Sequence, residues 1–150
     1  MGDRMARMVD VSEKEVVWRS AVAEGRLKLS PHTIETIADG AVKKGDVFTS
    51  SKLAGIQAAK ATPGILPLCH QIPLTSVEVE LDIDGHDLVA RCTVSAEYRT
   101  GVEMEALMGV TVALLNAWDM VKYLEKNETG QYPDTVITGI RVLKKQKGGK

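Results

Sequence analysis

The sequence has little of what marks a membrane, secreted or metal-binding protein. Its two cysteines, Cys69 and Cys92, have no spacing typical of a metal site. The N-terminus, MGDRMARMVDV, lacks the apolar core of a signal peptide, and we expect no apolar run long enough to span a bilayer. A net charge of −1 creates no global field that attracts nucleic acid. We therefore expect a cytoplasmic protein with reduced thiols.

Nucleotide-binding and metal-binding motifs are also missing. There is no Walker loop and no GxGxxG, and His32, His70 and His86 have no paired spacing, so no metal site is predicted. The composition, 44% hydrophobic and 26% charged, is ordinary for a globular protein. The length of 150 residues is that of one domain. We expect a single domain over residues 1–150, with short flexible ends at about 1–8 and 145–150.

What is present predicts an α+β fold. Hydrophobic periodicity and capping signals indicate strands and helices in the order β-α-α-β-β-α-β. The expected elements are a strand (16–29), a short helix (31–40), a second helix (46–61), a hairpin (76–84 and 88–96), a long helix (102–126) and a final strand (136–145). Apart from the extra short helix, this is the ferredoxin-like split β-α-β-β-α-β arrangement, one antiparallel sheet with helices on one face.

The long helix is apolar on two sides. One stripe, expected to face the core, contains Leu107, Val110, Leu114, Trp118 and Val121. A second stripe begins apolar and ends charged, and it contains Met108, Val112, Leu115, Asp119, Lys122 and Lys126. Because one sheet cannot cover both sides, we expect another subunit to bury the second stripe.

Two residues in other elements have an expected packing role. Gly55, inside the second helix, costs about 1 kcal/mol relative to alanine, which predicts close backbone packing there. Cys92 falls on the apolar register of its strand and is expected to be a core thiol.

Two stretches could perform acid–base chemistry. Asp119 and Lys122, three residues apart, share one helix face in an apolar run. Burial there would perturb both pKa values, although an ordinary surface ion pair is the alternative. His70 follows Cys69 in LCHQIPL, between two prolines that stiffen the loop. A lone histidine is more often structural, so that role is the alternative.

Two further stretches could bind a ligand or be merely structural. Lys43 and Lys44 precede Gly45-Asp46 and a helix N-terminus, a combination that favours phosphate but is common on surfaces. The acidic residues of 103-EME-105 stand at the start of the long helix, where negative charge is favourable without any function.

Taken together these stretches resemble one family. KKGDVFTSSKLAGIQAAK, ILPLCHQIPL, TGVEMEALMGVTVALLNAWDMVK and GIRVL, with MVDVS near the N-terminus and RSAVAEG at 19–25, are similar to the MoaC family of molybdenum cofactor biosynthesis. The likeness runs over most of the chain, and GDV, LCH, GVEMEA and WDMVK in this order form a highly specific combination.

The resemblance implies a reaction. It implies a lyase that converts 3′,8-cyclo-7,8-dihydroguanosine 5′-triphosphate, supplied by the radical-SAM GTP 3′,8-cyclase, into cyclic pyranopterin monophosphate and diphosphate. It also implies a homohexamer, a trimer of dimers, with sites at subunit interfaces. No cofactor is implied, although Mg²⁺ with the triphosphate or diphosphate is compatible with the chemistry.

The resemblance also implies a set of site residues that should share one pocket. The implied catalytic residues are Asp119, Lys122, Lys44 and His70. The implied substrate contacts are Leu68, Cys69, His70, Glu103, Met104, Glu105 and Arg19. Which lysine of the C-terminal KKQKGGK segment reaches the site stays open.

Two non-catalytic functions are the alternatives to an enzyme. Ferredoxin-like sheets often bind RNA through exposed aromatics, but this chain has one Phe and no RNP-type strand. A nucleotide-sensing relative that has lost catalysis is the other alternative. Release of diphosphate from the cyclic intermediate would separate an enzyme from both.

Overall fold

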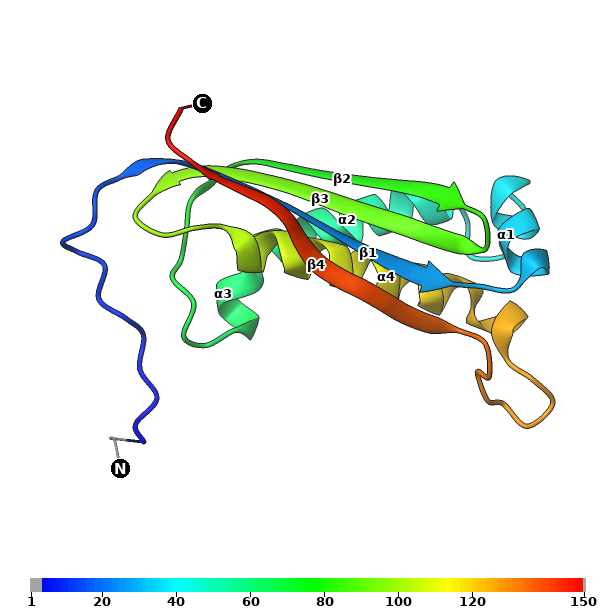
Figure 1. Ribbon diagram of the computed structural model, residues 1–150. Coiled ribbons are helices and arrows are strands. Elements are labelled where there is room, and N and C mark those ends of the chain that lie inside the picture. Colours follow the sequence, from blue (N-terminus) through cyan, green and yellow to red (C-terminus); the bar gives the residue numbers. More distant parts are fainter. Residues whose placement is uncertain (1–3, 150) are drawn as a thin grey trace.

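The fold is a single four-stranded sheet covered on one face by helices. The computed structural model describes residues 4–149. In chain order its elements are β1 (Val17–Lys28), α1 (Pro31–Ala38), α2 (Val47–Lys60), α3 (Thr62–Ile65), β2 (Leu74–Asp84), β3 (Asp87–Tyr98), α4 (Glu103–Glu125) and β4 (Val136–Lys147) (Figure 1). The strand order is β2-β3-β1-β4, and every neighbouring pair is antiparallel. The predicted ferredoxin-like arrangement is confirmed.

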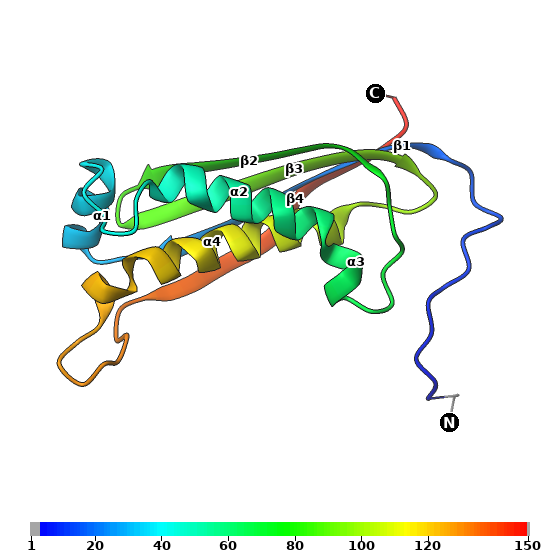
Figure 2. The same ribbon diagram turned by 180° about the vertical axis from the view of Figure 1, so that it is seen from behind.

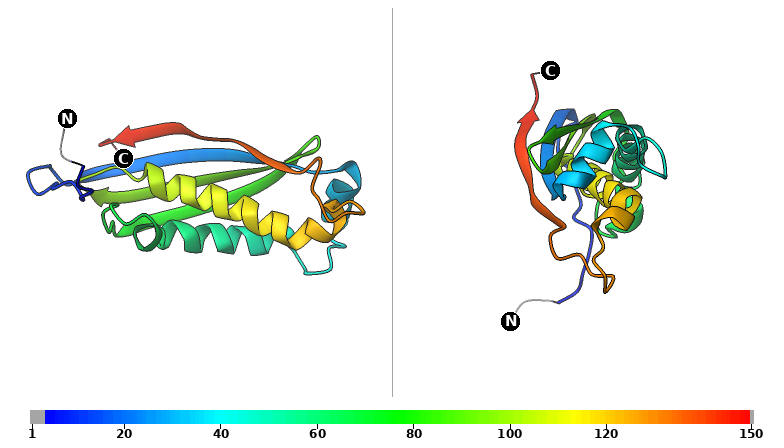
Figure 3. Two further views of the ribbon diagram at one scale, coloured as in Figure 1. Left: turned by 90° about the horizontal axis from the view of Figure 1, so that it is seen from below. Right: turned by 90° about the vertical axis from the view of Figure 1, so that its right-hand side faces the viewer.

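The two long helices lie side by side on one face of the sheet. Figure 2 shows α2 and α4 in front of the strands, and the end-on view in Figure 3 separates the sheet from the helical layer. The β2–β3 hairpin turns at Gly85, whose φ of 61° suits a residue without a side chain. The α3 helix is an addition to the prediction, which ended helix formation at Pro63-Gly64. Pro63 instead lies in the first turn of α3, where its missing N–H costs nothing.

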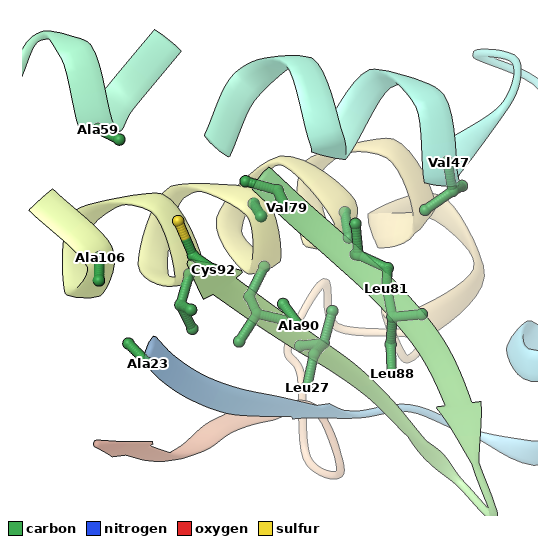
Figure 4. Packing of buried hydrophobic residues seen from close by; sticks show 14 of the residues in the cluster. Ala23, Leu27, Val47, Ala59, Val79, Leu81, Leu88, Ala90, Cys92 and Ala106 are labelled. Carbon is green, nitrogen blue, oxygen red and sulfur yellow. The ribbon is translucent and has the colours of Figure 1, made fainter. Parts of the chain in front are cut away.

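The core forms where the sheet meets α2 and α4. Alternate residues of β1, β2 and β3 point to the helices, among them Ala23, Leu27, Val79, Leu81, Leu88, Ala90 and Cys92 (Figure 4). The prediction for Cys92 is confirmed: its side chain is fully buried, and burial raises the pKa of its thiol to about 12. The core stripe of α4 is confirmed at Val110, Leu114 and Val121, which are fully buried.

Gly55 packs as its cost in helix propensity predicted. A Cβ atom at this position would lie 2.8 Å from the backbone oxygen of Gly109, so α2 and α4 approach each other backbone to backbone. No larger residue fits there without moving one of the two helices.

The ends of the helices are held by polar side chains. Ser30 caps α1, and Asp46 caps α2 by accepting hydrogen bonds from the backbone N–H groups of Phe48 and Thr49. Glu125, the last residue of α4, accepts hydrogen bonds from Ser30 and Thr33 at the start of α1 and from Thr135 just before β4. The carboxylate therefore joins the ends of α1 and α4 to the start of β4.

Two expectations about the chain as a whole need correction. Within residues 4–149, α4 is long and apolar enough to cross a membrane by length and composition, although no such run was expected. Half of that window is buried in the domain, as expected of the core helix of a globular protein. At the other end, β4 continues to Lys147, beyond residue 145, where the sequence predicted the last strand to end.

The second stripe of α4 lies on the surface of this chain. Leu115 is 56% exposed, and Ile65 of α3 is 59% exposed. A hollow of about 380 Å³ between α2, α3 and α4 is lined by Ala54, Gln57, Ala58, Ala61, Ile65 and Val112. That a second subunit covers this surface stays a prediction.

Candidate functional site

Asp119 lies between two lysines at the C-terminal end of α4. One carboxylate oxygen is 2.9 Å from Nζ of Lys44, and the other is 3.0 Å from Nζ of Lys122. Lys122 is one helical turn further along α4, whereas Lys44 comes from the loop between α1 and α2, 75 residues away. The fold therefore converts two separate sequence candidates into one charged cluster.

The loop that carries Lys44 is fixed by Tyr123. The Tyr123 hydroxyl accepts a hydrogen bond from the backbone N–H of Lys43 at 2.9 Å. The ammonium of Lys43 lies 5.0 Å from the centre of the same ring, a cation–π distance. Gly45 then turns the chain with a φ of 117° before Asp46 caps α2. These contacts fix the backbone on both sides of Lys44 and so the position from which its side chain extends.

Ion pairing, not burial, sets the electrostatics of this cluster. Hydrogen bonds from Lys44 and then Lys122 lower the pKa of the Asp119 carboxyl, and the pairing with Asp119 raises the pKa of Lys122. The sequence suggested that burial would shift the pKa of Asp119. The Asp119 side chain is 51% exposed in this chain, so ion pairing causes the shift instead. At neutral pH the cluster holds one carboxylate and two ammonium groups.

A second group of candidates gathers at the opposite end of α4. His70 and Cys69 lie in the loop between α3 and β2, beside a cavity of about 460 Å³. The other residues that line it are Met8, Pro63, Pro67, Gln71 and Tyr98. Nε2 of His70 is 2.6 Å from the backbone oxygen of Val9, in the segment that precedes β1.

Two groups at this end of α4, Glu105 and Cys69, have pKa values shifted in the direction opposite to that of Asp119. Glu105 is 2% exposed, and burial raises the pKa of its carboxyl even though it lies in the first turn of α4. Burial, followed by the nearby charge of Glu105, raises the pKa of the Cys69 thiol. These carboxyl and thiol groups therefore hold their protons more tightly than they would in water.

The remaining candidates at this end differ in exposure. Glu103 forms an ion pair with Lys145 at 3.1 Å, and Lys147 lies opposite Arg19 in the β1–β4 ladder, so two lysines of this segment lie beside candidate residues. Leu68 and Met104 are 46% and 42% exposed, as are several other large apolar side chains of this chain. Arg19 is buried, and its guanidinium donates to the backbone oxygens of Tyr98 and Arg99.

One chain does not bring the two groups together. Glu105 and Asp119 are separated by 14 residues of α4, which is about 21 Å at ~1.5 Å per residue. Figure 2 shows α1 beside the C-terminal end of α4 and α3 near its other end. The predicted single pocket therefore requires the two ends to come from different copies of the chain.

Several contributors were missed from the sequence. Tyr123 and Val9 act through a hydroxyl and a backbone carbonyl, for which residue type and spacing provide no signal. Tyr123 follows Lys122 directly, so its position beside the cluster was open to inference. Within residues 4–149, no group of three or more His, Cys, Asp or Glu side chains is arranged to hold a metal ion.

Comparison with known proteins decides the family. A family model described as MoaC family matches residues 8–148. The chain belongs to the MoaC family. A relative from Thermococcus kodakarensis, named "Probable cyclic pyranopterin monophosphate synthase", is 53% identical over 146 residues, 97% of this chain and 94% of its own.

Two more MoaC relatives carry related names. One from Archaeoglobus fulgidus has the same printed name and is 53% identical over 148 residues, 99% of this chain and 95% of its own. One from Methanothermobacter thermautotrophicus, named "Probable cyclic pyranopterin monophosphate synthase accessory protein", is 51% identical over 145 residues, 97% of this chain and 91% of its own. The family resemblance and the prediction that this chain is an enzyme are confirmed, and membership places the chain in molybdenum cofactor biosynthesis.

Proposed function

We propose that this protein converts 3′,8-cyclo-7,8-dihydroguanosine 5′-triphosphate into cyclic pyranopterin monophosphate and diphosphate. The observation that supports this best is the convergence of Lys44, Asp119 and Lys122, which come from two segments far apart in the chain. Such a cluster is suited to a substrate that both carries phosphates and needs proton transfers.

The opposite pKa shifts at the two ends of α4 support acid–base roles. Rearranging a purine into a pterin opens one ring and closes another, and each step moves protons. The lowered pKa keeps Asp119 ionised and so able to accept a proton, while the raised pKa of Glu105 suits it to donate one. His70 serves as a third group that can exchange protons near the cavity.

The lysines are suited to the phosphoryl part of the reaction. Closing the cyclic phosphate expels diphosphate, so negative charge develops on the phosphate oxygens. Lys44 and Lys122 carry half-exposed ammonium groups that can neutralise this charge. The proposed reaction needs no redox change and no cofactor, and any Mg²⁺ bound to the triphosphate or diphosphate would belong to the substrate.

The proposal includes assembly and setting. We propose a homohexamer, a trimer of dimers, in which each site takes one end of α4 from each of two subunits. The exposed second stripe of α4 supports a contact between subunits. We further propose a cytoplasmic protein that receives its substrate from the radical-SAM GTP 3′,8-cyclase.

Turnover of the cyclic triphosphate is the test of function. Incubation of the purified protein with the substrate should release diphosphate, and chromatography should detect cyclic pyranopterin monophosphate. Binding without release of diphosphate would identify a nucleotide-binding protein and overturn the proposal.

Subunit complementation tests the shared site. Asp119→Asn and His70→Ala should each be inactive alone, but an equal mixture reassembled from dissociated subunits should have about one quarter of its sites intact if subunits pair at random. Recovery to about 25% of wild-type activity is expected. No recovery from mixed oligomers would overturn a site built from two chains.

A further inference from the structure

The segment before β1 reaches His70 across the cavity. We define the N-terminal arm as residues 4–16, in which the structure forms no helix or strand. The Val9 carbonyl of this arm lies 2.6 Å from Nε2 of His70, 61 residues away in sequence. We propose that the N-terminal arm holds His70 in its Nε2–H form, so that Nδ1 is the nitrogen that exchanges protons with the substrate.

The assignment follows from the chemistry of the two partners. A backbone carbonyl can only accept a hydrogen bond, so Nε2 must carry the hydrogen whether the ring is neutral or charged. In the neutral ring the other nitrogen, Nδ1, is then the acceptor. Within residues 4–149 the structure forms no hydrogen bond to Nδ1. This nitrogen is therefore available to take a proton from a ligand.

The arm is itself ordered by contacts beyond Val9. The carboxylate of Asp10 accepts a hydrogen bond from the backbone N–H of Ser12 at 2.8 Å, and Arg99 donates to the Ser12 carbonyl at 3.4 Å. The hydrogen bonds from Ser12 are the main reason that the pKa of Asp10 is lowered, and His70 adds a smaller electrostatic contribution. Asp10 thus places a negative charge near the imidazole ring.

The arm also contributes to the lining of the cavity. Met8 lines it together with the loop residues Pro67 and Cys69. The Val9 carbonyl binds one ring nitrogen and so orients the ring. In many catalytic sites a carboxylate or carbonyl orients a histidine in the same way. We therefore assign Val9 as a positioning residue for His70. The position of the ring hydrogen follows from the structure alone, and only the role of Nδ1 in proton exchange rests on the proposed function.

Nuclear magnetic resonance can read the hydrogen position directly. Long-range proton–nitrogen correlation on ¹⁵N-labelled protein distinguishes a protonated from an unprotonated ring nitrogen. At about pH 8.5, where an ordinary imidazole is neutral, His70 should show a protonated Nε2 whose hydrogen exchanges slowly with water. His32 and His86, both exposed, are internal controls, and His70→Gln assigns the signal.

Two truncations separate Val9 from the rest of the arm. Removing residues 1–7 keeps Val9 and Asp10 but removes Arg4 and Met5, so it controls for their contacts. Removing residues 1–10 deletes the carbonyl, and Asp10→Asn controls for the charge that is lost with it. Neither truncation touches the sheet or the helices, because β1 begins at Val17. Unchanged melting temperatures and oligomeric states would verify this.

The two truncations should differ. The shorter one and Asp10→Asn should keep the slowly exchanging Nε2 hydrogen and the kcat of the full chain within about 3-fold. In the longer one the Nε2 hydrogen should no longer exchange slowly with water, and kcat should fall by about 10-fold. This is less than the ~10²–10⁴-fold expected for loss of an acid or base itself. A protonated Nδ1 in the full chain, or an unchanged His70 signal and kcat after removal of residues 1–10, would overturn the inference. Absence of turnover in the full chain would instead overturn the proposed function and leave the spectroscopic result standing.

Discussion

The two ends of α4 hold their carboxyl groups in opposite ways. At the N-terminal end Glu105 is buried, and burial raises the pKa of its carboxyl. At the C-terminal end Asp119 is half exposed, and two lysines lower the pKa of its carboxyl. The helix dipole alone would favour negative charge at the N-terminal end and disfavour it at the C-terminal end. Local burial and ion pairing thus reverse the order that the helix by itself would impose.

A third carboxylate on the same helix shows what a structural role looks like. Glu125 is 9% exposed and accepts hydrogen bonds from the backbone N–H of Ser30 at 3.1 Å, from the Ser30 hydroxyl at 2.9 Å and from Thr135 at 2.7 Å. Thr33 donates a fourth. Every donor is neutral and buried or half-buried. Glu125 is saturated, whereas the lysines of Asp119 remain open to solvent and to a ligand.

The largest effect is expected at Asp119. Asp119→Asn and Lys122→Ala should each lower kcat by at least ~100-fold, the scale of losing an acid–base group. Because Asp119 is half exposed, the melting temperature should change little or rise. Release of diphosphate and thermal unfolding would be measured on the same samples.

Control substitutions that remove the same charges elsewhere test whether the loss of activity at Asp119 and Lys122 is specific to these positions. Asp134→Asn and Lys28→Ala change the same charges at exposed positions outside the second stripe of α4 and should keep activity within about 2-fold. The double variant of Asp119 and Lys122 should be far from additive, since both serve one reaction. Near-normal turnover in either single variant would leave only a surface ion pair.

Glu125→Gln should have the largest effect on stability. An amide cannot accept from four donors as a carboxylate does, so unfolding should become easier by about 1–3 kcal/mol. For a chain of this length the melting temperature should fall by roughly 3–8 °C. Glu128→Gln, exposed in the following loop, is the matched control and should leave the melting temperature unchanged.

The pH dependence of this effect has a definite sign. Burial by itself would raise the pKa of Glu125, but hydrogen bonds from Thr33, Thr135 and Ser30 outweigh it and lower the pKa below the unfolded value of 4.5. The unfolded chain therefore binds the proton first, and the stabilisation is present above pH 4.5 and is lost as the pH falls through the folded pKa. A difference between wild type and Glu125→Gln that stayed constant down to pH 3 would contradict this account of the carboxylate.

Much of this architecture was predictable because it depends on local pattern. Alternation placed Cys92 in the core, and the cost of Gly55 anticipated the contact of α2 with α4. The joining of Lys44 to Asp119 is different, because it depends on how a loop folds back across 75 residues. Periodicity contains no such information, and the motifs supplied it only through family resemblance.

The environment of each acidic residue was the least predictable property. Asp119 lies in an apolar run yet points to solvent, while Glu105 lies at an exposed-looking helix start yet is buried. Both outcomes depend on which face of α4 meets the sheet at that turn. Close to a helix end, residue type and spacing do not show which side chains pack against the sheet and which point to solvent.

Tyr123→Phe tests how the C-terminal end is positioned. The change removes the hydroxyl that binds the Lys43 backbone but keeps the ring under its ammonium. Losing one such hydrogen bond, about 0.5–1.5 kcal/mol, should lower kcat/KM by roughly 2–10-fold as Lys44 becomes less well placed. Tyr123→Leu should be worse, since the ring contact is lost as well. Equal activity of Tyr123→Phe and wild type would show that the loop is fixed without the hydroxyl.

The smallest effect, and one of opposite sign, is expected from Glu105→Gln. The raised pKa of Glu105 means that the folded chain binds this proton more tightly than the unfolded chain does. Its stabilisation is present below the unfolded value of 4.5 and is lost as the pH rises through the folded pKa, so at neutral pH the buried carboxyl weakens the fold. The glutamine variant should therefore be more stable than wild type by about 0.5–1 kcal/mol at pH 7 and equal to it near pH 4. Thermal unfolding from pH 4 to 8 would measure this, with Glu128→Gln again as the control. If Glu105→Gln and Glu125→Gln shifted the melting temperature in the same direction, the contrast between the two ends of α4 would fail, because the sign is what separates a carboxyl held for chemistry from one held for structure.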